Sequence, residues 1–233
     1  MKTLLSILLY LFFYITATCQ TDCTYPALSK INNYADSVKQ NPSIKLVLLK
    51  NYIKDIVLDL RYATTNNFMS KKLYKSADAF YGLAATIALT KVQDSLKKIN
   101  LGLKIFDAYR PYAATCLMWQ VVKDDRYAAN PKTGSGHNRG IAIDLTLINF
   151  ITKTEVPMPT SFDNFSDTSH HNFTALPLNV LENRRILTTI MEHFGFKKLD
   201  TEWWHFQFIT AVKPPVFNIS FKHLKKINSY LKQ

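Results

Sequence analysis

The sequence predicts an α+β fold built as a single domain, with a mostly antiparallel sheet and helices packed against it. Three observations lead to this expectation. The chain has 233 residues, 47% hydrophobic and 20% charged, a globular composition that is long enough for one sizeable core. Helix-like and strand-like segments both occur, but they do not alternate regularly enough for a doubly wound parallel sheet. No internal repeat or flexible linker divides the chain, which contains only 6 Gly and 9 Pro.

The first 19 residues have the pattern of a secretory signal peptide. Lys2 precedes an apolar run over residues 4–15, and small residues follow up to Cys19. This run is shorter than the roughly 20 apolar residues of a membrane-spanning helix, so we expect no stable membrane insertion of the mature chain. We therefore expect a signal peptide over residues 1–19, one domain over residues 20–233, and an exported, periplasmic or secreted protein. A lipoprotein with its lipid on Cys19 is the alternative.

The chain is strongly basic, with a formal net charge of +12. Its lysines occur in small scattered groups and are not interleaved with aromatic residues along one element. Such scattering is typical of a solvated surface, and an exported protein rarely meets nucleic acid, so we expect no nucleic-acid partner. The sequence leaves the oligomeric state open.

Two cysteines, Cys23 and Cys116, follow the predicted signal peptide. In an exported protein they can form a disulfide, because such bonds persist in oxidising compartments. Cys116 also lies in an apolar stretch, residues 113–119, that suits a buried core thiol. Both interpretations of Cys116 remain open at this level.

Three helices are predicted from the spacing of apolar residues. In the first, apolar side chains from Ala85 to Ile99 recur every three or four residues, so one face is expected to pack on the core. The second covers residues 113–122, directly after a proline-containing turn. The third has its apolar face over residues 186–194 and ends at Gly195, a residue type that commonly terminates helices.

Four short apolar runs are predicted strands, because they are bounded by turn-forming residues and rich in β-branched or aromatic side chains. A polar loop over residues 123–136 and a long irregular stretch over residues 149–177 separate the later elements. Residues 32–50 show no decisive pattern, and the basic tail is either a helix over residues 220–231 or a loose segment. The predicted strands are residues 56–62, 103–106, 141–148 and 203–209.

Metal-ligating residue types gather in two short stretches. The first contains His137 and Asp144, separated by a glycine-containing turn, and the second contains His205. Two imidazoles, one carboxylate and an open fourth position have the layout of a catalytic zinc site. Glu202 would then lie close enough to take a proton from water. Because residues three apart on a regular strand point to opposite faces, we expect Glu202 where the strand begins or bends.

Each of these residues also has a structural interpretation. A histidine near an aspartate is more often a hydrogen-bonded pair than a metal site, and neighbouring Trp203 and Trp204 are more often core than substrate contacts. Neither stretch is diagnostic by composition or periodicity. The metal interpretation therefore depends on a wider pattern of residues.

That wider pattern consists of four separated blocks. They are residues 59–64 (DLRYAT), 107–111 (DAYRP), 135–147 (SGHNRGIAIDLTL) and 202–205 (EWWH). In composition and order these blocks closely resemble the D-alanyl-D-alanine dipeptidases, zinc peptidases of the vancomycin-resistance type with relatives exported to the periplasm. The resemblance covers about residues 53–208, most of the predicted mature chain.

The resemblance implies a zinc site at the sheet, with one zinc ion per chain. His137, Asp144 and His205 match the zinc ligands of the family. Glu202 matches its catalytic base, and Arg110 matches the arginine that stabilises the oxyanion formed when water attacks the peptide carbonyl.

The resemblance also implies a substrate pocket. Ser135 matches a serine that lines it, while Tyr62 and Asp163 match the pair that receives the free amino group of the dipeptide. A carboxylate suits that place because a buried ammonium needs a charge partner. His170 and His171 fall in a further matching block, and we expect them to serve local structure rather than the metal.

The implied activity is zinc-dependent hydrolysis of D-alanyl-D-alanine to two D-alanines, with this small dipeptide as the partner. One alternative is a D,D- or L,D-carboxypeptidase that trims peptidoglycan stem peptides, which needs the same metal set and differs in the amino-group pocket. The other is a non-catalytic zinc-binding module, which has no need of Glu202 or Arg110.

Overall fold

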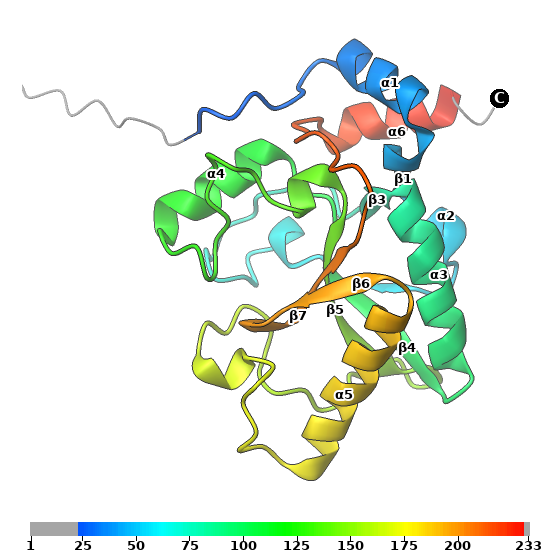
Figure 1. Cartoon of the computed structure of the whole chain (residues 1–233), viewed down its shortest axis with the longest axis vertical. Coiled ribbons are helices and arrows are strands. Elements are labelled where there is room, and N and C mark those ends of the chain that lie inside the picture. Colours follow the sequence, from blue (N-terminus) through cyan, green and yellow to red (C-terminus); the bar gives the residue numbers. More distant parts are fainter. Residues whose placement is uncertain (1–22, 231–233) are drawn as a thin grey trace, which may run out of the picture.

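A five-stranded sheet with the order β2-β4-β5-β7-β6 forms the centre of the molecule (Figure 1). The computed structural model describes residues 23–230, so the predicted signal peptide lies outside the described residues. Strand β2 pairs with β4 in parallel, and the other neighbours pair antiparallel, as the predicted single-domain α+β fold requires. The strands are β2 (Val57–Leu58), β4 (Leu101–Asp107), β5 (Ala142–Asn149), β6 (Phe196–Leu199) and β7 (Glu202–Phe208).

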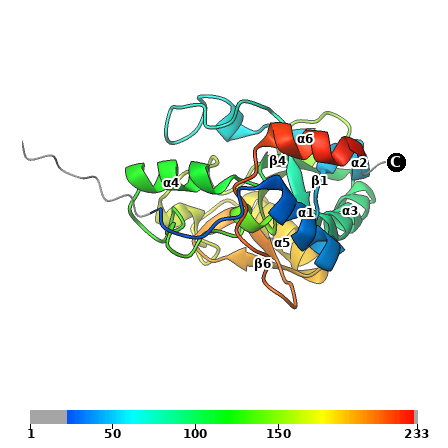
Figure 2. The same cartoon turned by 90° about the horizontal axis from the view of Figure 1, so that it is seen from above.

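Two long helices pack on this sheet. Helix α3 (Leu83–Lys97) contacts β4, while α5 (Leu178–His193) contacts β5, β6 and α3. Helix α4 (Tyr112–Val121) lies on the opposite side of the molecule from α3 in both views (Figures 1 and 2). Among the described residues, no helix combines the length and the apolar character needed to cross a bilayer.

The two ends of the described chain meet at one side of the sheet. Helices α1 and α6 lie side by side in both views (Figures 1 and 2), and the ring of Tyr34 packs edge-on against Phe217 at 5.3 Å between centroids. Strands β1 and β3 form a small antiparallel pair. The remaining elements are α1 (Ile31–Gln40), β1 (Leu46–Leu48), α2 (Leu49–Tyr52), β3 (Phe80–Gly82), α6 (Phe221–Tyr230) and the 3-10 turns η1 (Pro42–Ile44), η2 (Arg61–Ala63), η3 (His137–Arg139) and η4 (Asp167–Ser169).

The predicted helices are confirmed, with one wrong boundary, at the end of α3. Helix α3 ends at Lys97, so the prediction that Ile99 belongs to its buried face is wrong, and Ile99 is 53% exposed. The reason is Asn100, whose left-handed backbone (φ 56°) closes the helix end. Helix α5 begins at Leu178, directly after the predicted irregular stretch, and stops before Gly195 as predicted. Of the two alternatives for the tail, the helix is the one observed.

The strands that carry the predicted metal ligands are confirmed, whereas the first predicted strand is largely wrong. Of residues 56–62, β2 retains only Val57–Leu58, and Tyr62 lies in the turn η2. The carbonyl of Tyr62 accepts hydrogen bonds from the amides of Leu73 and Tyr74, at 2.8 and 3.0 Å. These bonds hold the chain in a turn, and the Tyr62 ring is thereby buried beside the pocket described below.

A disulfide joins Cys23 to Cys116 and settles the interpretation that the sequence left open. It fastens the start of the described chain to α4. The amide of Tyr25 also donates to the hydroxyl of Tyr112 at 3.1 Å. The segment before α1 is therefore held across α4 by both a covalent bond and a hydrogen bond.

Candidate active site

Three charged or polar side chains line up across the middle of the sheet. Asp144 on β5 is the cross-strand partner of His205 on β7 and of Asp107 on β4. Cross-strand partners project from the same face of a sheet, so these side chains meet. A β-bulge between Ile105 and Asp107 brings Asp107 into this register.

His137 reaches the same place from the turn η3, just before β5. The turn ends at Gly140, whose left-handed backbone (φ 68°) would be strained for other residues and whose missing side chain leaves room for Leu46. The Nδ1 atom of His137 lies 2.8 Å from the carbonyl oxygen of Ala108. This hydrogen bond fixes the imidazole so that Nε2 faces the row of sheet residues.

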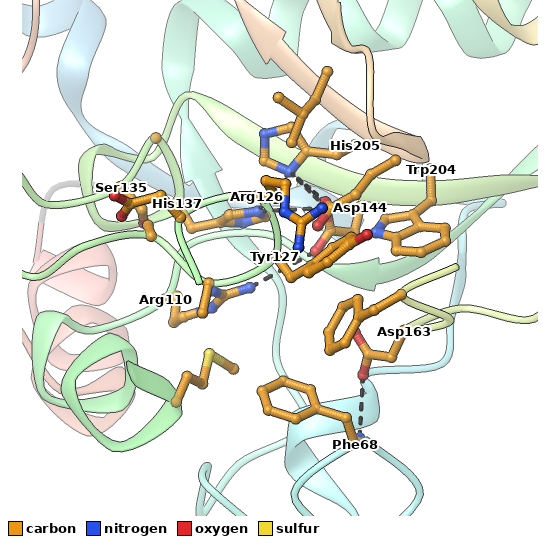
Figure 3. A pocket seen from close by; sticks show the side chains of 18 of the residues that line it. Phe68, Arg110, Arg126, Tyr127, Ser135, His137, Asp144, Asp163, Trp204 and His205 are labelled. Atoms are coloured by element: carbon orange, nitrogen blue, oxygen red, sulfur yellow. Dashed lines mark hydrogen bonds and ion pairs between the residues drawn. The ribbon is translucent and has the colours of Figure 1, made fainter. Parts of the chain in front are cut away.

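The candidate metal cluster consists of His137, Asp144 and His205, whose ligand atoms all lie within 4.8 Å of one another (Figure 3). His205 Nδ1 lies 3.0 Å from Asp144 Oδ1 and 3.2 Å from His137 Nε2. His137 Nε2 lies 3.4 Å from the same Asp144 oxygen. The structure thus brings together the three residues that the sequence predicted as ligands.

The donor set of this cluster fits a zinc ion. Because Nδ1 of His137 donates to a carbonyl, Nε2 presents a lone pair toward Asp144. Burial lowers the pKa of His205, which favours the neutral imidazole that metals bind. Burial alone would raise the pKa of Asp144, but its contacts with both histidines outweigh burial and hold that pKa below its usual value. Two imidazoles and a carboxylate facing one another are typical zinc ligands.

Glu202 is the first residue of β7, and the pairing of β6 with β7 shifts register between Lys198 and Leu199. The prediction that Glu202 lies where the strand begins or bends is confirmed. Its Oε2 atom lies 3.8 Å from His205 Nδ1. Burial raises the pKa of Glu202 well above its usual value, and the charges of Asp144 and Asp163 raise it further.

Arg110 lies directly beside the metal cluster and is held there by Asp107. The Arg110 Nε donates to Asp107 Oδ2 at 2.8 Å, and Nη2 lies 3.7 Å from Asp144 Oδ2. The guanidinium also lies over the ring of Tyr62, 5.1 Å from its centroid. A fixed, buried cation at this place can stabilise negative charge that develops next to the metal.

Sequence reasoning missed three residues that support this arrangement. Asp107 stood in the DAYRP block without an assigned role, although a carboxylate three residues before the key arginine was a usable signal. Tyr74 donates its hydroxyl to Asp107 Oδ1 at 3.0 Å, and nothing in its local sequence marks it. Asn138 is fully buried and donates to the carbonyl of Arg110 at 2.8 Å, so it joins the Arg110 and Ser135 segments.

Tyr62 and Asp163 meet at the far end of the same pocket. The Tyr62 hydroxyl donates to Asp163 Oδ1 at 2.9 Å, and the amide of Phe68 approaches Oδ2 at 3.4 Å. Asp163 has a left-handed backbone (φ 62°), which is uncommon for a residue other than glycine and often accompanies functional positions. Burial raises the pKa of Asp163 to about 7, against the opposing hydrogen bond from Tyr62.

All of the predicted site residues line one pocket of about 250 Å³ (Figure 3). Ser135 accepts a hydrogen bond from the amide of Asn138 at 3.1 Å, so its hydroxyl hydrogen remains free for a ligand. The rings of Phe68, Phe165 and Tyr127 form a wall on the side of Asp163.

The paired tryptophans and histidines have separate roles. Trp203 belongs to the core and donates Nε1 to Thr160 at 2.9 Å, as the structural interpretation predicts. Trp204 is equally buried but lines the pocket, so for this residue the core interpretation is incomplete. His170 and His171 lie outside the metal cluster, and the amide of His171 bonds to the carbonyl of Asp200 at 2.9 Å.

Known proteins match this chain over most of its length. Residues 42–226 match the M15 peptidase family described as D-ala-D-ala dipeptidase. The chain is 34% identical over 177 residues to the D-alanyl-D-alanine dipeptidase of Escherichia coli (strain K12). The matched region covers 76% of this chain and 91% of the relative. It is 32% identical over 185 residues to the D-alanyl-D-alanine dipeptidase of Enterococcus faecium, covering 70% of this chain and 91% of that one.

Among solved structures, VanYB in complex with D-Alanine-D-Alanine is similar with a TM-score of 0.39 and 14% identity, over 69% of this chain and 87% of that chain. The match to the family covers well over half of the chain, and the first two relatives are matched over nearly their whole length. This chain therefore belongs to the D-ala-D-ala dipeptidase family of M15 peptidases, which are zinc metallopeptidases.

Proposed function

We propose that this protein hydrolyses the dipeptide D-alanyl-D-alanine to two D-alanines in a zinc-dependent reaction. The observation that carries the proposal is the presence of the Tyr62 and Asp163 pair in the same pocket as the metal cluster. The pocket volume of about 250 Å³ is below the roughly 300–1,000 Å³ of sites for drug-sized ligands, which favours a small substrate. Relatives that cover most of this chain carry the name D-alanyl-D-alanine dipeptidase, which further supports the proposal.

We assign the metal to His137, Asp144 and His205, with one zinc ion per chain. A zinc ion at these ligands supplies a Lewis acid that polarises the scissile carbonyl and lowers the pKa of water. The surrounding protein fixes the ligands, because Ala108 accepts from His137 and Asp107 lies 3.7 Å from the same imidazole nitrogen. Such supporting contacts orient ligands and tune their basicity.

Four other residues perform the steps of the proposed reaction. Glu202 takes the proton of the attacking water and passes it to the leaving amine. Arg110 stabilises the negative charge that develops on the carbonyl oxygen. The carboxylate of Asp163 receives the substrate ammonium, while the hydroxyl of Tyr62 holds that carboxylate in place. Ser135 adds a hydroxyl donor to the pocket wall.

The experiment that tests this function separates it from both alternatives. Purified mature protein, with and without a chelator, is incubated with D-Ala-D-Ala, L-Ala-L-Ala and N-acetyl-D-Ala-D-Ala. A charge-assisted bond to the free ammonium contributes about 1.5 to 3 kcal/mol. We therefore expect at least about tenfold higher kcat/KM for the free dipeptide than for the acetylated one, since about 1.4 kcal/mol is a factor of ten. Chelation should abolish the activity and added zinc should restore it.

Comparable kcat/KM for the free and acetylated substrates would instead favour the carboxypeptidase that trims peptidoglycan stem peptides. Zinc retention without hydrolysis of any of the three substrates would favour the non-catalytic zinc-binding module.

We also propose that residues 1–19 form a signal peptide that is removed on export, leaving one domain over residues 20–233. The disulfide between Cys23 and Cys116 supports this proposal, because disulfides persist mainly in oxidising compartments. N-terminal sequencing of the native protein is expected to begin close to Cys19 and Gln20. Recovery of Met1 would refute export by this route, and a lipid on Cys19 would place the protein at the membrane surface.

A further inference from the structure

The pocket contains a cation that the proposed reaction leaves unused. Among the described residues, Arg110 and Arg126 are the guanidinium groups that line it. Arg110 is buried and held by Asp107. Arg126 comes from the loop that follows α4, and its side chain is 63% exposed. In Figure 3, Arg126 and Tyr127 lie next to the metal cluster in the pocket.

The backbone of Arg126 is fixed beside the proposed catalytic residues. Thr201, which immediately precedes Glu202, donates its hydroxyl to the carbonyl of Arg126 at 3.2 Å. The next residue, Tyr127, stacks on Phe165 with 4.8 Å between ring centroids. The loop is therefore anchored at the pocket rim, whereas the guanidinium of Arg126 extends from it into a solvent-accessible position.

The guanidinium already holds a carboxylate in the geometry that a substrate would need. Arg126 Nε lies 3.0 Å from Asp124 Oδ1, and Nη2 lies 2.6 Å from Asp124 Oδ2. Two parallel bonds of this kind are the usual way in which arginine recognises a carboxylate. An exposed ion pair contributes little to stability, so Asp124 is readily exchanged for another carboxylate.

The proposed substrate brings such a carboxylate into the pocket. D-alanyl-D-alanine is a zwitterion, and two residues span at most about 7 Å, so a dipeptide held by Asp163 keeps its carboxylate inside the pocket. Asp125 and Asp144, which also line the pocket, oppose a negative charge there. Resting on the proposed function, we propose that Arg126 is a specificity-determining residue that releases Asp124 and binds the C-terminal carboxylate of the dipeptide.

The test compares D-Ala-D-Ala with D-alanyl-D-alaninamide, which lacks the negative charge. The variants are Arg126→Gln, Arg126→Lys, Asp124→Asn and the control Arg185→Gln. Arg185 is a matched control because its side chain is 64% exposed and forms the same fork with Glu182 on α5. Both glutamine variants lower the net charge by one unit, so the effect of net charge alone is matched.

We expect Arg126→Gln to lower kcat/KM for the free dipeptide about tenfold or more, mainly through a higher KM. The kcat/KM for D-alanyl-D-alaninamide should remain almost unchanged. Arg126→Lys should be intermediate, since a lysine keeps the charge but not the fork. Asp124→Asn should lower KM for the free dipeptide, because its side chain no longer competes as an anion. Arg185→Gln should match the unmodified enzyme, and zinc content and melting temperature should be unchanged in all variants.

A second readout keeps this inference separate from the proposed function. Calorimetry of D-Ala-D-Ala binding to the Glu202→Gln variant and to the double variant that also carries Arg126→Gln measures the affinity without turnover. The difference between the two affinities reports the contact of Arg126 with the substrate carboxylate. Arg126-dependent binding without hydrolysis by the unmodified enzyme would overturn the proposed function alone. If Arg126→Gln hydrolyses both substrates with the same ratio of kcat/KM for D-Ala-D-Ala to kcat/KM for D-alanyl-D-alaninamide as the unmodified enzyme, only the role of Arg126 is overturned. Absence of both binding and hydrolysis would overturn both.

Discussion

The guanidinium of Arg110 and the carboxylate of Asp107 form a buried ion pair, in which Nε and Nη2 both lie 2.8 Å from Oδ2. Asp107 is 1% exposed at its side chain and also accepts a hydrogen bond from Tyr74. It lies 3.7 Å from Nδ1 of His137 as well. One carboxylate thus orients both the proposed oxyanion donor and a proposed metal ligand.

Replacement of Asp107 with Asn should therefore impair both catalysis and stability. Loss of a supporting contact of this kind typically costs about 10- to 100-fold in activity. A buried guanidinium left without its partner costs about 3 to 5 kcal/mol of unfolding free energy. Steady-state kinetics and chemical denaturation measure the two effects. As a control, Asp59→Asn breaks the more exposed pair with Arg61 and should change stability by about 1 kcal/mol or less. Equal activity and equal unfolding free energy of the two variants would argue against this role of Asp107.

Replacement of His205 with Ala should abolish retention of zinc, because it leaves the site with two protein ligands. Elemental analysis of the purified variant measures the metal content per chain. His223→Ala serves as the control, since His223 is an exposed residue of α6, and this variant should keep full occupancy. Full zinc content in His205→Ala would show that the assigned ligand set is wrong.

Replacement of Glu202 with Ala should leave zinc content unchanged and reduce activity, because this residue is proposed to move protons and not to bind metal. General acid–base groups contribute about 10²- to 10⁴-fold, and a loss in this range of kcat is expected. Activity that survives within a factor of about three, well below that range, would exclude Glu202 as the base.

The affinity for D-Ala-D-Ala should depend on pH through Asp163. Its pKa is raised to about 7, so below that pH the carboxyl is protonated and cannot attract the substrate ammonium. Affinity is therefore expected to rise with pH through about 7 and to fall again above about 8, where the substrate ammonium deprotonates. Calorimetry on Glu202→Gln measures this without turnover and without titration of Glu202.

The matched control for this pH dependence is Asp163→Asn in the same background. It should bind the dipeptide more weakly and lose the rise with pH, because asparagine does not ionise. Binding to Glu202→Gln that shows no dependence on pH would contradict the assigned role of Asp163.

The disulfide between Cys23 and Cys116 should contribute to stability, since it joins residues 93 positions apart. Removal of both cysteines by substitution with Ser is expected to lower the unfolding free energy by about 2 to 4 kcal/mol. Denaturant titration with and without a reducing agent measures the difference. Reductant should destabilise the unmodified protein and leave the double variant unaffected. An identical transition for the oxidised protein and the double variant would refute a stabilising role.

The sequence by itself determined the chemistry of the site and much of the local structure. The strands β5 and β7 and the helices α3, α4 and α5 follow from apolar spacing, whereas the three metal-ligating residues follow from residue type together with the resemblance of four sequence blocks to a known family. These features are readable because they depend on ligand chemistry and on hydrogen bonding between near neighbours in the chain. Even the start of β7 at Glu202 followed from the geometry of a single strand.

Only the tertiary structure decided which distant residues meet. Tyr62 and Asp163, which the resemblance implied as a pair, meet across 101 positions at a turn that replaces the predicted strand, and a bulge sets Asp107 opposite Asp144. The pairing of the cysteines and the place of Arg126 at the pocket rim were equally hidden from local patterns. The physical reason is that such contacts depend on strand register, bulges and the burial of whole elements, which are properties of the packed chain and not of any one segment.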